Sequence, residues 1–292
     1  MTKPHLIFVI FINLIWGSMF VVATIALFDF PPVFFSALRF GLLTIMLASF
    51  LPVARHLIWP LIKVGLVMGV GMYLTLYISL YLAENTASVA LVSKLEVPFA
   101  LILSVLILRE NIGIQRITGI AVAFVGAMII GFDPAALNDI PALLAMTASS
   151  GFYAVTMIMI RQMDDVPPLT ITAWVSLVCA PVLLLISLVF EENHLQVMQE
   201  ADLSAWTALA YTVVFGSIIS HTGMYYLLQR YPVNNIVPFN LLSPVFAVIG
   251  GILFLEDTVS AGLVIGGLMV LAGVGWINIR SGKQENSETP AK

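Results

Sequence analysis

Two oppositely charged residues, Lys94 and Glu96, lie inside an apolar run long enough to cross a bilayer, "ASVALVSKLEVPFALILSVLIL" over residues 87–108. On insertion scales, an unpaired charge at the bilayer centre costs roughly 2.5–3.5 kcal/mol. Charges at that depth commonly bind substrates or carry protons, and a structural ion pair is the alternative. The two positions are about 200° apart around a regular helix, so we expect Lys94 and Glu96 to find partners on different neighbouring helices.

A proline follows this pair at Pro98. Proline removes the hydrogen bond to the carbonyl four residues earlier, which here is the carbonyl of Lys94, and Pro244 does the same for Asn240. Irregular backbone at membrane depth is tolerated only where it is buried in protein or lines a wet cavity. We therefore predict that Pro98 and Pro244 are hinges and that Lys94, Glu96 and Asn240 line a substrate cavity.

Arg39 is the other basic residue inside an apolar run, about two turns from the predicted external end of the second run. Its guanidinium could snorkel to the outer headgroups or turn inward to clamp a carboxylate. The inward orientation would allow either a substrate carboxylate or a structural ion pair with Glu96. Both orientations remain open from the sequence.

Tyrosine recurs every four residues at Tyr73, Tyr77 and Tyr81, which places three phenols along one slowly drifting stripe of a helix. Tyr81 lies near the predicted external interface, where an aromatic-belt anchor is expected. Tyr73 and Tyr77 lie deeper, and we predict that they line the cavity. Hydrogen bonding between helices is the alternative for this pair.

Three more residues are candidates for the cavity: Asn13, Trp16 and His221. Asn13 and Trp16 share one face of the first apolar run, with packing as the alternative. His221 lies near Tyr225 in the eighth run and could relay protons, because imidazole titrates in the physiological range. A hydrogen-bonded packing role is its alternative.

Glu110 and Glu256 lie at the ends of the fourth and ninth apolar runs. Carboxylates at helix ends often accept hydrogen bonds from backbone amides. We predict that both satisfy amides of the turn that follows them rather than bind a substrate.

The elements that must position these residues are membrane helices. Of the 292 residues, 60% are hydrophobic and 10% are charged, whereas soluble domains have about 45–50% apolar residues. Apolar stretches near the ~20 residues of a bilayer-spanning helix recur, without the alternation of a membrane barrel, so we predict an all-α protein of ten transmembrane helices. The stretches cover residues 6–26, 33–53, 60–81, 87–108, 114–131, 141–160, 169–190, 205–229, 235–255 and 261–279.

The basic residues are segregated. If the loops alternate sides, ten of the 12 Lys and Arg residues fall on one side, and the two left over lie inside apolar runs. The positive-inside rule then predicts that both termini are cytoplasmic, in a plasma membrane such as the bacterial inner membrane. The polar end of the chain, residues 281–292, is predicted to be a disordered cytoplasmic tail.

The two halves of the chain align with each other. An offset of 146 aligns Pro98 with Pro244 and Glu110 with Glu256. With one further inserted residue, the glycines that align are Gly119 with Gly266 and Gly126 with Gly273. Five helices per copy is an odd number, so the second copy must be inverted in the membrane. We predict a first repeat over 1–132 and a second, inverted repeat over 133–280 around a central cavity, an arrangement typical of alternating-access transporters.

Four segments resemble the drug/metabolite transporter superfamily, specifically the EamA-type exporters, and the resemblance covers essentially the whole chain. They are "FINLIWGSMFVVATIA", "SALRFGLL", the proline-containing fourth run ending in "LRE", and "LLSPVFAVIGGILFLED". The resemblance implies ten helices arranged as a basket around a central cavity, and export of amino acids or related metabolites. Lys94 and Glu96 stand where small or neutral polar residues would be more typical of the family.

The motifs of the chain favour a secondary transporter over an enzyme. The sequence lacks a phosphate-binding loop for ATP, and its four histidines and lone Cys179 lack metal-ligand spacing, so we predict no cofactor and no metal site. The predicted partners are a small-molecule substrate and the lipid bilayer, with protons as a candidate coupling ion, a homodimer left open and no nucleic acid. The alternatives are a membrane enzyme acting on lipid-linked substrates, for which the loops are short, and a passive channel.

Overall fold

The computed structural model describes residues 1–82, 92–131, 140–246, 264–274 and 276, and all regular secondary structure within these ranges is helical. In the first half, proline lies in the first turn of the first two helices, where its missing N–H costs no hydrogen bond. The helical segments of this half are α1 (Lys3–Leu27), α2 (Pro32–Met46), η1 (Ala48–Phe50), α3 (Arg55–Leu66), η2 (Val67–Tyr73), α4 (Leu74–Leu82), η3 (Ser93–Leu95), α6 (Glu96–Leu108) and α7 (Ile114–Gly131).

The second half has a similar order, with one additional short helix, α10, between two long ones. Its segments are α8 (Ile140–Arg161), α9 (Pro168–Phe190), α10 (His194–Glu200), α11 (Leu203–Tyr211), η5 (Thr212–His221), α12 (Thr222–Arg230), α13 (Val233–Ile236) and η6 (Val237–Leu242). Helix continues over residues 243–246 and is present again over residues 264–274.

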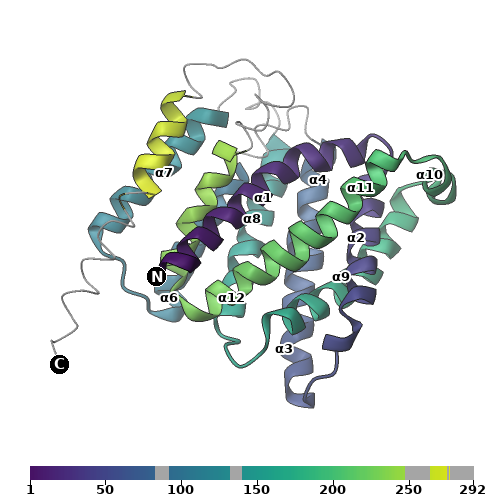
Figure 1. Ribbon diagram of the computed structural model, residues 1–292, viewed down its shortest axis with the longest axis horizontal. Helices are drawn as coiled ribbons and strands as arrows, with labels where there is room; N and C mark the ends of the chain where they lie inside the picture. The colour runs from purple at the N-terminus through teal and green to yellow at the C-terminus, as the bar shows by residue number, and fades with distance from the viewer. Residues whose placement is uncertain (83–91, 132–139, 247–263, 275, 277–292) are drawn as a thin grey trace.

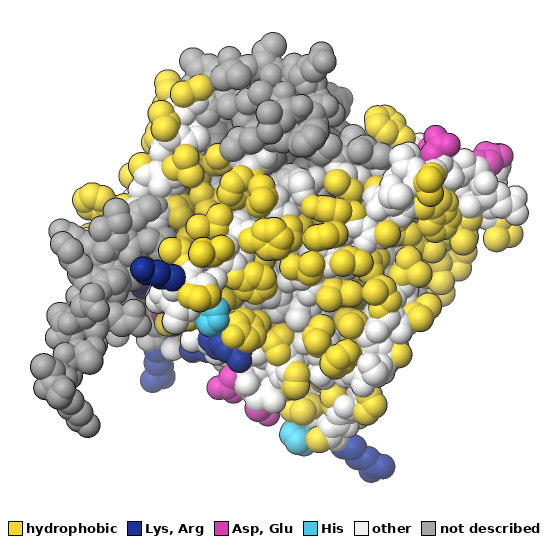
Figure 2. Space-filling model, viewed as in Figure 1, with side chains coloured by type: hydrophobic (Ala, Val, Ile, Leu, Met, Phe, Trp, Pro, Cys, Tyr) yellow, Lys and Arg dark blue, Asp and Glu magenta, His cyan; other side chains and the backbone are white. Residues whose placement is uncertain are grey.

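Several helices are suited to a membrane. Among the described residues, four are long and apolar enough to cross one: Arg55–Ser79, Ile140–Arg161, Pro168–Phe190 and Leu203–Arg230. Figure 2 shows hydrophobic side chains over the middle of the visible face, with most of the visible Lys and Arg side chains toward its lower edge. The chain is therefore built as a multi-pass membrane protein.

Described helix lies within each of the ten predicted apolar stretches. The number of spans nevertheless stays a prediction, because parts of three of these stretches, 87–108, 235–255 and 261–279, are outside the described residues. Glu256 and the predicted tail over 281–292 also lie outside them. The division into repeats over 1–132 and 133–280 likewise stays a prediction.

The helices lose regular geometry at the two prolines. A 3₁₀ segment precedes Pro98, in η3, and another precedes Pro244, in η6. Proline cannot supply the next helical N–H, so the preceding turn tightens to the 3₁₀ pattern. The carbonyl of Asn240, which cannot bond Pro244, accepts both the backbone N–H of Ser243 and its hydroxyl, the latter at 2.9 Å. Rotation about these points as hinges stays a prediction.

The aligned glycines bring two helices into close contact. α7 lies beside the helix over residues 264–274, drawn in yellow in Figure 1. A Cβ atom on Gly126 would lie 2.6 Å from the carbonyl oxygen of Gly266, and one on Gly273 would meet the carbonyl oxygen of Gly119. The contact of Gly126 with Gly266 is therefore matched by the contact of the aligned glycines, Gly273 with Gly119. Side chains at these points would force the two backbones apart.

Two carboxylates bond the first amides of distant helices. Glu110 accepts the backbone N–H groups of Val233 and Asn234, at 2.9 and 3.1 Å, at the start of α13. The prediction that Glu110 bonds backbone amides is confirmed, but the prediction that they belong to the following turn is wrong. The chain after Glu110 turns into α7, and the carboxylate instead bonds amides of the other half of the molecule.

Glu191 makes the matching contact and was not predicted. It follows α9 and accepts the N–H groups of Val33 and Phe34, at 2.9 and 2.8 Å, at the start of α2. A helix start leaves its first amides without intrahelical partners and carries a partial positive charge, so a carboxylate fits there.

Candidate functional site

Lys94 and Glu96 are both buried, and both bond the same neighbouring segment. Lys94 Nζ donates to Ser243 Oγ at 3.0 Å, and Asn240 Nδ2 donates to Glu96 Oε1 at 3.1 Å. The prediction that the two charges have partners on different neighbours is wrong. It assumed a regular α-helix, whereas Lys94 lies in a 3₁₀ turn. Asn240, in η6, and Ser243, the residue that follows η6, are three apart and present two partners on one face.

The ion pair between Glu96 and Arg39 does not form among the described contacts. Glu96 is bonded by Asn240 and interacts electrostatically with Lys94. We call Lys94, Glu96, Asn240 and Ser243 the charged joint. Because Lys94 aligns with Asn240, this joint connects equivalent positions of the two halves and contains one cation and one anion.

Arg39 turns inward rather than snorkelling. The residue is only 5% exposed, and its Nε donates to Ser217 Oγ on η5 at 3.0 Å. Its guanidinium carbon lies 5.6 Å from the centroid of the Phe40 ring. Its Nη2 is buried and has no hydrogen-bond partner among the described residues. Arg39 is thus a buried cation with an unused donor.

Tyr73 and Tyr77 extend the surroundings of Arg39. Their rings stack with centroids 6.3 Å apart, and Tyr73 also meets the Phe40 ring edge-on at 4.9 Å. The Tyr77 hydroxyl bonds the hydroxyl of Ser36 on α2, and the Tyr73 hydroxyl lies 3.2 Å from His221 Nε2. Both phenols therefore make the interhelical hydrogen bonds that were the alternative to cavity lining, which stays a prediction. The side chain of Tyr81 lies outside the described residues.

His221 connects the tyrosines to α1. Its ring lies 5.6 Å from that of Trp16 and 6.2 Å from that of Tyr225, as the sequence position near Tyr225 suggested. Asn13, one turn before Trp16, is buried and donates to the carbonyl of Val9 at 2.8 Å. Participation of Asn13, Trp16 and His221 in substrate or proton movement stays a prediction.

We call Trp16, Arg39, Tyr73, Tyr77 and His221 the central aromatic cluster. These residues come from α1, α2, η2, α4 and η5, so the cluster is assembled from both halves of the chain. The two π-helical segments, η2 and η5, supply Tyr73 and His221, and π segments are often found at functional sites.

Unpaired polar atoms gather around this cluster. Buried polar groups are normally hydrogen-bonded, so each exception needs an explanation. In the described part of the chain, six buried side-chain atoms lack a partner, and four of them lie on α1, α2 and η5. The four are Asn13 Oδ1, Arg39 Nη2, Ser220 Oγ and His221 Nδ1; the others are Asn235 Oδ1 and Asn240 Oδ1. Such a concentration of unused donors and acceptors could hold a polar ligand.

The sequence reasoning did not identify Ser36, Ser217 and Ser243, which bond Tyr77, Arg39 and Lys94. Serine is common in membrane helices, and its importance here depends on which helices meet. The only available signal was that each buried charge or phenol must have some partner nearby.

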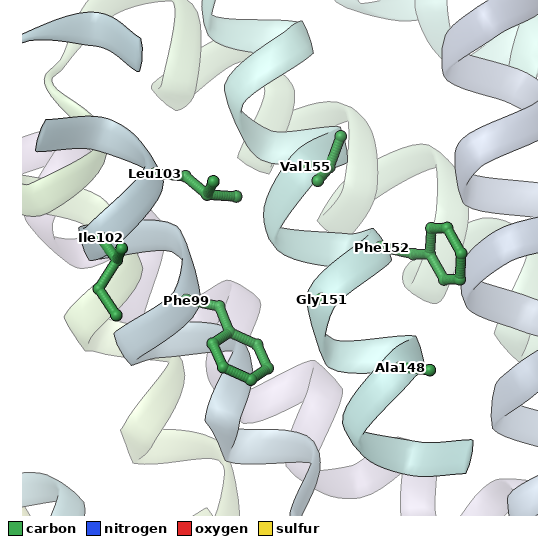
Figure 3. Close-up of a pocket in the computed structure, with 7 residues that line it drawn as sticks. All are labelled: Phe99, Ile102, Leu103, Ala148, Gly151, Phe152 and Val155. Atoms are coloured by element: carbon green, nitrogen blue, oxygen red, sulfur yellow. The ribbon is translucent and has the colours of Figure 1, made fainter. Parts of the chain in front are cut away.

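An apolar groove of about 450 Å³ lies between α6 and α8. Figure 3 shows the residues that line it: Phe99, Ile102, Leu103, Ala148, Gly151, Phe152 and Val155. None of the residues predicted to bind substrate contributes to it. A wall without polar side chains gives a polar substrate no hydrogen bonds, so this groove is not the candidate substrate site.

The helical architecture, with several helices long and apolar enough to cross a membrane, defines a multi-pass membrane protein. The EamA-like transporter family matches the chain twice, over residues 3–132 and 140–279. The chain belongs to this family, which confirms the resemblance seen in the sequence and places it in the drug/metabolite transporter superfamily.

Relatives of known sequence span nearly the whole chain. A "Probable amino-acid metabolite efflux pump" of Salmonella typhimurium (strain LT2) is 23% identical over 275 residues, covering 91% of each chain. A protein of the same name from Escherichia coli (strain K12) is 21% identical over 293 residues, covering 96% of each chain. A solved crystal structure, described only as that of a protein, matches with a TM-score of 0.81 and 20% identity over 98% of this chain and 100% of that one. This structural similarity supports the fold.

Proposed function

We propose that the protein is a secondary transporter that exports amino acids or closely related metabolites by alternating access. The observation that carries this proposal is the unpaired Nη2 of Arg39, buried in a membrane helix within the central aromatic cluster. A buried guanidinium that leaves one donor nitrogen unpaired is costly, and a substrate carboxylate would supply the acceptor for that nitrogen.

The chemistry around Arg39 suits an amino acid. A guanidinium can bond a carboxylate through two parallel N–H groups, which fixes the orientation of the ligand. The aromatic faces of Trp16 and Tyr73 would attract an ammonium group or pack against an apolar side chain. The relatives named as amino-acid metabolite efflux pumps support the same substrate class.

The proposed topology follows the sequence predictions. Ten spans form two inverted repeats with both termini in the cytoplasm of a bacterial cell, and the substrate site lies between the repeats. The matching contacts of Gly126 with Gly266 and of Gly273 with Gly119 support this symmetry. Protons are the proposed coupling ion, with His221 as the candidate carrier.

A counterflow assay tests the function. Proteoliposomes loaded in turn with each of the twenty L-amino acids should accumulate the same radiolabelled amino acid for at least one of them. Arg39→Gln should lower that rate by about 30-fold or more, because removing one partner of a buried charge pair costs roughly 2–5 kcal/mol.

Arg55→Gln is the matched control, since Arg55 is exposed at the start of α3. This variant should transport at the wild-type rate. If no amino acid is exchanged by well-folded wild-type protein, the proposed substrate class is wrong. If Arg39→Gln exchanges as fast as Arg55→Gln, the proposed site is wrong.

A further inference from the structure

The contacts of Glu110 and Glu191 have the same chemistry at two places. In each, both oxygens of one carboxylate accept two successive backbone N–H groups at the start of a helix that follows a proline. We call Glu191 with Val33 and Phe34 the Glu191 latch, and Glu110 with Val233 and Asn234 the Glu110 latch. Bonds from amides to a carboxylate are roughly twice as strong as neutral ones.

Each latch joins the first half of the chain to the second, in opposite senses. Glu110 belongs to the first half and bonds α13 of the second, whereas Glu191 belongs to the second half and bonds α2 of the first. α2 packs against α9, and α6 packs against α13 and η6. The latches therefore lie on two of the contacts between the halves.

The latches lie at opposite ends of the molecule. Three helices, α7, α8 and α9, separate the end of α6 from the end of α9, so a chain that crosses with each helix arrives on the other side. Figure 1 agrees, with α10, which follows Glu191, at the upper right and the connection from α6 to α7 at the lower left.

Different side chains support the two carboxylates. Ser187 Oγ donates to Glu191 Oε2 at 2.8 Å and also lies 2.8 Å from His194 Nε2, while the His194 ring meets the Phe34 ring edge-on at 4.7 Å. At the other end, Arg116 Nη1 donates to Asn234 Oδ1 at 2.7 Å, and Asn234 Nδ2 donates to the carbonyl of Asn111. Each latch is thus held in place by polar contacts beyond the two backbone amides.

We infer that Glu191 and Glu110 are the closing contacts of two gates that open alternately, one toward each side of the membrane. This inference rests on the proposed alternating access. In the present structure the hydrogen bonds of both latches are formed. Opening toward one side requires the α2–α9 end to separate at Glu191, and opening toward the other requires the α6–α13 end to separate at Glu110.

Substitution by glutamine should weaken one latch at a time. Glutamine retains one acceptor oxygen but places an NH₂ donor where the second oxygen faced a backbone N–H. The affected gate should then open more often, and because the conformations share one population, the opposite gate should open less often. A local loosening of one helix end would raise access on that side without lowering it on the other.

Thiol labelling in membrane vesicles measures this reciprocity. A reporter cysteine replaces Ser220, a buried midspan residue whose hydroxyl has no partner in the described part of the chain. The background is Cys179→Ser. A membrane-impermeant maleimide is applied to right-side-out and to inside-out vesicles. Glu191→Gln should raise labelling from the Glu191 side about fivefold or more and lower it from the Glu110 side, and Glu110→Gln should do the reverse.

Glu192→Gln and Asp165→Asn are the matched controls, since both acids are exposed near the respective ends of the protein. These controls should label like the parent. Labelling that rises on one side only, rises equally on both sides, or stays at the parent level in both latch variants overturns the inference. Amino-acid counterflow by the parent in the same vesicles tests the proposed function separately, so a parent that exchanges amino acids while its latch variants show no reciprocity refutes only the gates.

Discussion

The central aromatic cluster and the charged joint both bury a cation in the membrane, but the two cations differ in their partners. Lys94 lies close to the opposite charge of Glu96 and donates to Ser243, so its charge is balanced within the protein. Arg39 has the hydroxyl of Ser217 as its acceptor and retains a buried, unpaired Nη2. A balanced pair can hold helices together, whereas an unbalanced cation is suited to an anion that arrives and leaves. This difference assigns stability to one region and substrate binding to the other.

The largest expected effect separates the two cations by stability. Lys94→Met strands the carboxylate of Glu96 and should destabilise the protein by about 3–5 kcal/mol. Arg39→Met removes a cation that has no buried counter-ion among the described residues, so it should cost about 1 kcal/mol or less. Melting temperatures in one detergent measure the contrast. Equal losses for the two variants would show that Arg39 also has a stabilising charge partner.

A double variant sharpens the assignment of the charged joint. If Lys94 and Glu96 chiefly stabilise the structure, Lys94→Met combined with Glu96→Leu should regain about 2 kcal/mol or more relative to Lys94→Met alone, because no isolated charge remains. The double variant should also retain amino-acid counterflow.

The competing interpretation is that Glu96 carries protons or lines the substrate path. In that case Glu96→Gln should yield stable protein that exchanges substrate but does not accumulate it under a proton gradient. Gradient-driven uptake and exchange measured on one preparation distinguish these outcomes.

The smallest expected effect compares two serines. Ser217→Ala and Ser243→Ala each remove the acceptor of one buried cation and should each cost about 1 kcal/mol of stability. Because only Ser217 orients Arg39, Ser217→Ala alone should also weaken amino-acid binding, by about threefold to tenfold. Melting temperature and ligand affinity measured side by side check this pair. Weaker binding in Ser243→Ala would place the charged joint within the substrate site.

The sequence predicted those features of the fold that depend on local composition or on proline. Apolar stretches located the helices, and Pro98 and Pro244 located the irregular turns, because the missing N–H has the same local effect in any fold. The glycines that align between the two halves also lie at a close contact between helices, that of Gly126 with Gly266.

Pairwise contacts were predicted less well, because they depend on how helices meet. Because Lys94 lies in a 3₁₀ turn, its side chain points in a different direction from the one expected for a regular α-helix. The π-helical segment η5 places Ser217 beside Arg39 and His221 beside Tyr73. Glu110 was expected to bond its own turn because the approach of α13 has no local signature. The inward orientation of Arg39 was one of two open possibilities until Ser217 was located.

The most direct test of the account is the selectivity for the carboxylate group at Arg39. For the amino acid exchanged fastest in the counterflow assay, affinity is measured in nanodiscs alongside that of its amide, which lacks the carboxylate charge. The wild-type protein should prefer the amino acid by about tenfold or more, and Arg39→Gln should bring this ratio close to one while Lys94→Gln leaves it unchanged. An undiminished preference in folded Arg39→Gln protein, or its loss in Lys94→Gln, would contradict the central claim.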